Sequence, residues 1–330
     1  MIPEVNLKTP WPSIEFAHTP GQPVLIFFAG FPDDCKSGWG DVLTNLVKEE
    51  KYHVICLCMP EYQSNCIQHK QWGYQPHELL LMLRETIKYY VKDQKVNLVT
   101  HDWGAFFGIV YQNHFPELVD KLVLLDIGVG LDFSVHTVFV LLFYQFYFAI
   151  SYIISQIFGK PAGTIFFGLF FILKLDKILG PCPNEGRLNR PRKELSAYLC
   201  YIYYNFWKMM ITNRNVLKPV NPTCPVLFMY GRKKRILFHS TAFVDYLTDK
   251  GYPNKILGFD AGHWFQLVYP KEVSDEIRAF IPGISKKNIN NNANNDTNTT
   301  KSPDSDSSSN NKTNDNFLNF IWEIPGVKEL

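Results

Sequence analysis

Short apolar runs alternate with helical patterns between Pro23 and Pro282, as a mostly parallel β-sheet with crossover helices requires. The runs consist mainly of Val, Ile, Leu and Phe with little polar alternation, which is typical of strands covered on both faces. We therefore predict an α/β domain with a doubly wound sheet. Its strands are predicted at 24–29, 53–59, 96–100, 121–126, 226–230 and 255–259, and its helices at 76–92, 103–114, 241–251 and 270–280.

One long stretch interrupts this alternation. No strand is evident from about Gly130 to Lys218, where the pattern indicates several helices inserted between two strands of the sheet. We interpret residues 130–218 as a helical lid, and residues 1–129 together with 219–283 as the core domain.

The end of the chain has a different composition. Residues 284–316 are almost entirely Asn, Ser, Thr, Asp and Lys, so they bury too little apolar surface to become ordered, and we predict a linker without fixed structure. Residues 317–330 return to an apolar pattern, with Phe317, Phe320 and Trp322 near helical spacing. This segment docks either on its own chain, which we prefer, or on a partner.

Composition narrows the function classes. The chain carries 33 Lys and Arg against 31 Asp and Glu, a net charge of +2, so no global field attracts nucleic acid, and we expect no nucleic-acid partner. The seven cysteines include no Cys-x-x-Cys pair, which favours reduced, buried thiols. The first twenty residues show no basic start followed by an apolar run, so we expect no signal peptide and a cytoplasmic location.

The most informative fragment is the sequence THDWG at 100–104, which follows an apolar strand and precedes a helical pattern. A nucleophile at such an elbow sits in strained backbone at a helix N-terminus, and a Gly two positions later lets the turn close. The nucleophile position is Asp102. A carboxylate is a poor acyl nucleophile, but it can displace a leaving group from saturated carbon and leave an alkyl ester. The fragment therefore favours epoxides or alkyl halides as substrates.

Two further fragments fall where a hydrolase of this kind carries them: AGFP at 29–32 after the first strong strand, and AGHW at 261–264 after the last. With these three motifs the chain resembles the α/β-hydrolase family, in its epoxide hydrolase and haloalkane dehalogenase branch, over residues 20–283. The resemblance implies that His263 activates water against the ester. It also implies that the backbone N–H groups of Phe31 and Trp103 bind the oxyanion.

The acid that would orient His263 is not at the position where many relatives carry it. Where they carry an Asp after the penultimate strand, this chain has Lys234, which cannot orient a protonated imidazole. Other members carry the acid after the strand before the lid, and we assign it to Asp126, 24 positions beyond the nucleophile. The alternative is that Asp126 only braces the start of the lid. Ala29 and Thr100 also replace the family's usual His and Gly.

The leaving group decides between epoxide and halide. An epoxide oxygen leaves as an alkoxide and needs an acid, whereas a halide needs N–H donors such as two indoles. The lid sequence YQFYF at 144–148 resembles the tyrosine segment of soluble epoxide hydrolases, so Tyr144 is the first predicted proton donor. Tyr203 is the second, with Tyr204 as its fallback; ordinary aromatic packing is the alternative for each. Many dehalogenases place a halide-binding Asn at the position of Phe31, which also favours the epoxide.

Residues 137–158 carry no formal charge and are long enough to cross a bilayer. One crossing would separate Asp102 from His263, so we prefer a lid that lines a tunnel for an apolar substrate, with peripheral membrane contact through the lid as an addition. The basic cluster at 232–235 is interpreted as a solvated loop that could also bind anionic lipid.

These observations predict a hydrolase that acts on a small apolar epoxide through a covalent ester of Asp102 and releases a diol. Hydrolysis of a carbon–halogen bond is one alternative. A non-catalytic protein that binds a ligand or partner is the other, because Lys234 replaces the usual acid. We expect no cofactor and no metal, since no His, Cys and acid cluster has ligand spacing and no Gly-rich phosphate loop occurs.

Overall fold

The computed structural model describes residues 4–63, 70–175, 190–191, 194–212 and 216–284. The chain divides into two units, Met1–Gly283 and Ile284–Leu330. The expectations for the polar linker beyond residue 284 and for the apolar segment 317–330 lie outside the described residues. The sheet, its helices and the candidate site all belong to the first unit.

The described residues form a seven-stranded sheet of order β1-β3-β2-β4-β5-β6-β7. The strand β1 pairs antiparallel with β3, and all other neighbours are parallel. Every residue of β2, β3 and β4 is buried, which agrees with the near-continuous apolar runs of the sequence. The strands are β1 (Ser13–Ala17), β2 (Val24–Phe28), β3 (His53–Leu57), β4 (Val96–His101), β5 (Val119–Leu125), β6 (Val226–Gly231) and β7 (Lys255–Phe259).

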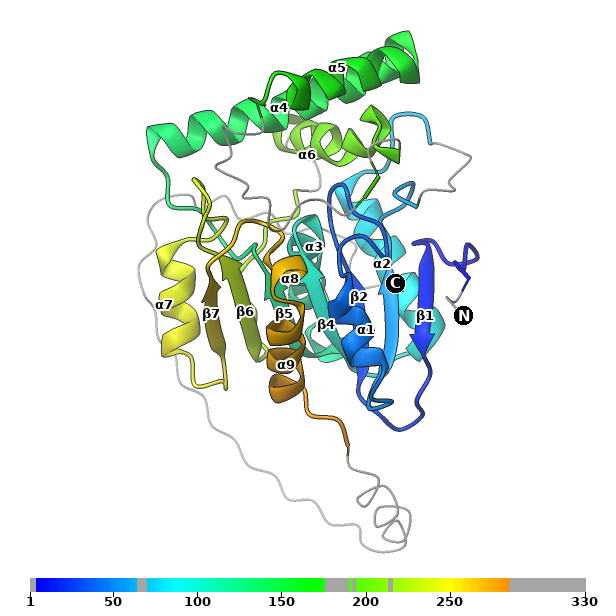
Figure 1. The fold of residues 1–330 in the computed structure, drawn as a ribbon, viewed down its shortest axis with the longest axis vertical. Helices are drawn as coiled ribbons and strands as arrows, with labels where there is room; N and C mark the ends of the chain where they lie inside the picture. Colours follow the sequence, from blue (N-terminus) through cyan, green and yellow to red (C-terminus); the bar gives the residue numbers. More distant parts are fainter. Residues whose placement is uncertain (1–3, 64–69, 176–189, 192–193, 213–215, 285–330) are drawn as a thin grey trace, which may run out of the picture. The chain divides into compact units, whose positions relative to one another are not determined.

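Helices cover both faces of this sheet, as predicted for a doubly wound fold. The helices α1 (Asp41–Val47), α8 (Phe265–Val268) and α9 (Pro270–Phe280) pack together on one face (Figure 1). The helices α2 (Pro76–Val91) and α3 (Trp103–His114) contact each other on the other face, and α7 (Thr241–Asp249) packs against β7. A short 3-10 helix, η1 (Pro116–Leu118), leads into β5.

The predicted strands and helices all occur, with shifts at their ends. The strand β5 begins at Val119 and ends at Leu125, so Asp126 lies just beyond it rather than inside it. The prediction missed β1, α1 and α8, which are only 5, 7 and 4 residues long. The sequence SIEFA of β1 is half-buried at the sheet edge, so it lacks the long apolar run by which the other strands were recognised.

Between β5 and β6 the described residues hold only helices: α4 (Val135–Phe158), α5 (Lys160–Ile172), the 3-10 helix η4 (Ala197–Cys200) and α6 (Tyr201–Thr212). Figure 1 shows α4 and α5 side by side beyond the carboxyl ends of the parallel strands, with α6 between α4 and the sheet. We use the name lid for these helices.

The turn between β4 and α3 is the tightest point of the fold. Asp102 has a φ of 56°, a conformation that costs an L-residue free energy. A Cβ at Gly104 would lie 2.2 Å from the Phe28 carbonyl oxygen, and a Cβ at Gly30 would lie 2.2 Å from Asp102 Oδ1. Glycine is therefore required at both positions because the backbones of β2 and the β4–α3 turn approach so closely.

We expect Gly104→Ala to lower the free energy of unfolding by about 1–3 kcal/mol, because the added methyl group meets rigid backbone. The measurement is chemical denaturation. Gly168→Ala is the matched control: nothing lies within 4 Å of its added Cβ in α5, so stability should stay equal or rise by up to ~1 kcal/mol. Equal losses in both variants would contradict the close approach.

Candidate active site

Five loops that follow parallel strands meet at one edge of the sheet. Phe31 follows β2, Asp102 follows β4, Asp126 follows β5, Lys234 follows β6 and His263 follows β7. Because these strands are parallel neighbours, their carboxyl ends all lie at the same edge, where α/β folds place their ligands. Residues far apart in the sequence are thereby brought together.

Asp102 sits at the N-terminus of α3. The Phe31 N–H donates a hydrogen bond of 2.7 Å to Asp102 Oδ1, and the positive end of the helix dipole faces the same carboxylate. The backbone nitrogen of Trp103 adjoins Gly30 at this turn, since a Cβ on Gly30 would approach it to 2.3 Å. The structure thus groups Phe31, Asp102 and Trp103 at one point.

His263 lies between two carboxylates. Its Nε2 is 3.3 Å from Asp102 Oδ2, and its Nδ1 bonds Asp126 Oδ2. Burial alone would lower the pKa of His263, but the charges and hydrogen bonds of Asp126 and Asp102 outweigh burial and raise this pKa to about 9. At neutral pH the imidazole is therefore protonated, and both of its N–H groups have an acceptor.

Asp126 is fully buried and its carboxylate has three partners. Besides His263, it accepts a 3.1 Å hydrogen bond from the Gly231 N–H, and Lys234 Nζ lies 2.5 Å from Asp126 Oδ1. Burial would raise the pKa of this carboxyl group, but Lys234 and His263 hold it well below its usual range. The carboxylate therefore stays charged throughout the working range of pH.

Lys234 thus differs from the predicted solvated loop. Its side chain is 6% exposed, whereas Arg232 and Arg235 in the same basic cluster are exposed. Burial lowers the pKa of Lys234, and Asp126 opposes that effect. The residue that replaces the usual acid therefore forms an ion pair with the acid supplied by the neighbouring strand.

Four charged groups consequently form one contact chain: the Asp102 carboxylate, the His263 imidazolium, the Asp126 carboxylate and the Lys234 ammonium. Two negative and two positive charges cancel, so the chain is neutral. A neutral assembly is far less costly to bury than one unpaired charge. Asp126 lies at its centre, bonded to both cations.

Two predicted lid tyrosines lie together near Asp102. Tyr144 of α4 and Tyr203 of α6 are buried, with ring centroids 6.2 Å apart and nearly perpendicular rings. Burial is the main cause that raises the pKa of both phenols, and the Asp102 charge adds to it. The Tyr203 ring contacts Phe31 and Trp103 at 5.1 and 5.4 Å.

Tyr204, the fallback donor, points to another side of α6. Its ring packs against Tyr152 and Trp72, at 5.6 and 5.5 Å, and Lys208 lies over it. The structure brings Tyr203, and not Tyr204, to the rings around Asp102. Neighbouring positions on a helix differ in direction by about 100°, so the two adjacent tyrosines have different surroundings.

Two neighbours of Asp102 and His263 were not predicted to belong to the site. His101 is fully buried, its ring centroid is 4.5 Å from that of His263, and burial lowers its pKa to about 4, so it is neutral. Asp33 accepts a 2.9 Å hydrogen bond from the Trp264 indole, and burial raises its pKa to about 6. Its position, three residues after Gly30 in the first motif, is the signal that could have identified it.

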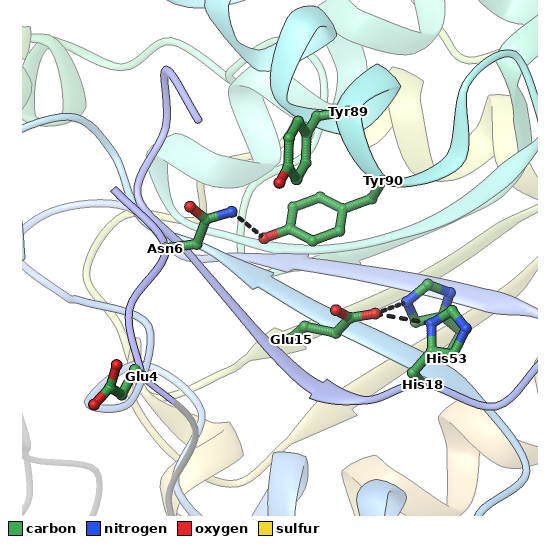
Figure 2. A pocket seen from close by; sticks show the side chains of 7 residues that line it. All are labelled: Glu4, Asn6, Glu15, His18, His53, Tyr89 and Tyr90. Atoms are coloured by element: carbon green, nitrogen blue, oxygen red, sulfur yellow. Dashed lines mark hydrogen bonds and ion pairs between the residues drawn. The ribbon is translucent and has the colours of Figure 1, made fainter. Parts of the chain in front are cut away.

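A second cluster lies at the opposite ends of the parallel strands from the candidate site, where β3 begins. Glu15 Oε1 bonds His53 Nε2 at 2.6 Å and His18 Nδ1 at 2.9 Å, beside a cavity of about 450 Å³ that Tyr89 and Tyr90 also line (Figure 2). Three ligand atoms of this type could hold a divalent cation, although sequence spacing predicted no such group. The two hydrogen bonds to Glu15 account for the arrangement without a metal.

Comparisons with known proteins agree with this fold. The family model described as "alpha/beta hydrolase fold" matches residues 23–270. The chain is 22% identical to mouse epoxide hydrolase 3 over 275 residues, which cover 78% of this chain and 70% of that protein.

Solved structures are similar in fold at low identity. A mutant of a potato epoxide hydrolase matches with a TM-score of 0.59 and 15% identity, covering 85% of this chain and 99% of its own. Epoxide hydrolase A from Mycobacterium thermoresistibile matches with a TM-score of 0.58 and 17% identity, covering 86% and 99%. A thermophilic esterase from Thermogutta terrifontis matches with a TM-score of 0.58 and 14% identity, covering 82% and 93%. Because an esterase scores as well as the epoxide hydrolases, these likenesses show the fold alone.

The geometry makes a prediction about the protonation of His263. In a titration followed by NMR of the imidazole rings, His263 should lose its proton near pH 9, while His101 stays neutral down to about pH 4. Asp102→Asn should lower the pKa of His263, because one of the two carboxylates that favour the imidazolium is removed.

Lys234→Met should raise the pKa of His263, because Asp126 then has no competing cation. Lys233→Met is the matched control: its ammonium pairs with the exposed Asp260 instead. Equal shifts in the two lysine variants, or a wild-type His263 that is neutral at pH 7, would contradict the four-group arrangement.

Proposed function

We infer the reaction from the premise that this chain belongs to the α/β-hydrolase fold family and is an epoxide hydrolase-like hydrolase. We propose that it hydrolyses a small apolar epoxide through a covalent ester of Asp102 and releases a diol. One observation carries the proposal: a carboxylate at the elbow, with one oxygen on a backbone N–H and the other facing a histidine.

In the first step, Asp102 Oδ2 forms a bond to one epoxide carbon while the bond from that carbon to the ring oxygen breaks. Oδ1 keeps its hydrogen bond to the Phe31 N–H and becomes the ester carbonyl oxygen. The leaving alkoxide takes a proton from Tyr144 or Tyr203, the phenols near Asp102. The tyrosinate that results regains a proton at the expense of the His263 imidazolium, which leaves a neutral imidazole for the second step. The product is an alkyl ester of Asp102 with a free hydroxyl group.

In the second step, His263 takes a proton from water as the water attacks the ester carbonyl carbon. Negative charge develops on Oδ1, where the N–H groups of Phe31 and Trp103 serve as donors. The acyl–oxygen bond then breaks, the imidazolium returns the proton to the departing oxygen, and the diol leaves. Asp102 is left as a carboxylic acid with one oxygen from water, and it passes its proton to His263, which restores the carboxylate and the imidazolium of the resting enzyme.

The charge balance explains why His263 can act as a base although its pKa is raised to about 9 in the resting enzyme. Ester formation removes the negative charge of Asp102, so an imidazolium would leave the contact chain with one excess positive charge. Release of its proton to the tyrosinate left by the first step restores neutrality, because Lys234 already balances Asp126. The proton loss that prepares His263 for the second step is thus coupled to the first.

Two observations favour an epoxide over a halide. Tyr144 and Tyr203 offer two phenols near the nucleophile. A halide site would need N–H donors, and the Trp264 indole, next to His263, already donates to Asp33. The rival hypothesis of a non-catalytic protein predicted that His263 would lack an acid partner, whereas Asp126 bonds it. The cytoplasmic location and the absence of a nucleic-acid partner stay predictions.

The experiment that tests the covalent step is a single turnover of an aryl epoxide in ¹⁸O-labelled water. The first diol should carry unlabelled oxygen from Asp102, because water attacks the ester carbonyl and not the substrate carbon. Label in that first product would contradict the mechanism. Asp102→Asn should lower turnover by roughly 10³-fold or more, and an alkyl bromide tests the halide alternative in parallel.

The two tyrosines should act on the first step alone. We expect Tyr144→Phe and Tyr203→Phe each to slow ester formation by about 10–100-fold and the double variant further, with ester hydrolysis nearly unchanged. Stopped-flow measurement of each step decides this. Tyr147→Phe is the control, since its hydroxyl donates to the Phe166 carbonyl within the lid. Equal slowing of both steps would assign Tyr144 and Tyr203 to packing.

A further inference from the structure

The lid helices α4 and α5 each carry exposed aliphatic or aromatic residues. Phe139 and Ile157 of α4 are 61% and 60% exposed, and Ile165 and Ile172 of α5 are 68% and 72% exposed. Ile150 of α4 is exposed as well. We call these five residues the lid stripe. An apolar surface of this kind is uncommon on a protein that meets only water.

Helical spacing shows that α4 has two distinct sides. Phe139, Ile150 and Ile157 are separated by 11 and 7 residues, which returns each to the same side of a helix with 3.6 residues per turn. Tyr144 and Phe148 are buried on the other side. Phe148 packs against Phe31 at 5.2 Å, so that side is fixed to the catalytic loops.

The helix α4 is long and apolar enough to cross a membrane. In this fold, however, it lies against α5, η4 and α6, and it could not cross a bilayer without leaving the contacts that hold it over the sheet. An apolar helix with one side buried in protein and one side exposed is instead typical of attachment in the plane of a membrane surface.

The distribution of charged residues around the lid stripe also favours contact with a membrane surface. The 24 residues of α4 include no Asp, Glu, Lys or Arg, so no charge has to be desolvated when the stripe leaves water. Lys160, which begins α5, and Lys174, which follows its end, are exposed. Two cations beside an uncharged apolar surface complement anionic headgroups above acyl chains.

We propose that the lid stripe inserts into the interface of a lipid bilayer and that the enzyme takes its substrate from the membrane. The second part rests on the proposed function. Because Tyr144 lies on the opposite side of α4 from the stripe, one helix diameter, about 10–12 Å, separates the bilayer from the proton donor. The substrate class is then a lipophilic epoxide dissolved in the bilayer.

Flotation with vesicles tests the attachment. The full-length protein should float with vesicles of about 70% phosphatidylcholine and 30% phosphatidylserine, and bind less to phosphatidylcholine alone. The triple variant Ile157→Gln, Ile165→Gln, Ile172→Gln should lose roughly ten-fold or more of its vesicle binding, because three apolar contacts are removed. The matched control replaces the exposed Leu7, Leu81 and Val220 by Gln and should bind like wild type.

Asp102→Asn separates this proposal from the proposed function, since it should float like wild type whether or not the chemistry is right. Equal binding by the triple variant and the control, or no flotation of wild type, overturns the attachment. Loss of a dimer in the triple variant without loss of flotation would assign the stripe to a second copy of the chain. Unchanged folding, checked by circular dichroism, keeps these outcomes interpretable.

Uptake of the substrate from the membrane is tested with two epoxides. With a lipophilic epoxide presented in vesicles, the triple variant should lose kcat/KM in proportion to its lost binding, while kcat/KM for a water-soluble aryl epoxide stays unchanged. Equal loss on both substrates would mean that the variant damages the site, and equal retention on both would overturn uptake from the membrane.

Discussion

The contact between Asp126 and its two cations is the interaction on which the arrangement of the candidate site depends. A fully buried carboxylate is costly unless it is paired, and this one holds an imidazole through one oxygen and an ammonium through the other. Its position just beyond β5 places it between the loops after β6 and β7, so the sheet itself fixes the geometry. Lys234 stands where many members of the family carry an acid, but His263 still has an acidic partner, which is Asp126.

Residues that lie in short sequence motifs could be predicted to belong to the site, whereas contacts between distant parts of the chain could not. Asp102 and His263 lie in short motifs that follow apolar strands, so the sequence alone located them. The ion pair of Lys234 with Asp126 joins residues 108 positions apart, and only the sheet order shows that their loops are neighbours. The sequence shows a cation at position 234, but the burial of Lys234 could not be predicted from a basic tetrapeptide.

The fold shows the same division between local and distant signals. Strands with continuous apolar runs were recognised, whereas the edge strand β1 is only partly buried and was missed. Tyr203 and Tyr204 are adjacent in sequence, and helix packing decides that Tyr203 contacts Trp103, next to Asp102, while Tyr204 contacts Tyr152. The group of Glu15, His18 and His53 forms because β1 and β3 pair, a fact that ligand spacing does not contain.

The two sides of α4 are linked mechanically. Its inner side bears Tyr144, and its outer side bears Phe139 and Ile157 on the same rigid cylinder. Rotation of this helix about its own axis by a single residue step, about 100°, would swing the phenol away from Asp102. Any torque applied from outside is thus transmitted directly to the orientation of the Tyr144 hydroxyl group, with no hinge between the two.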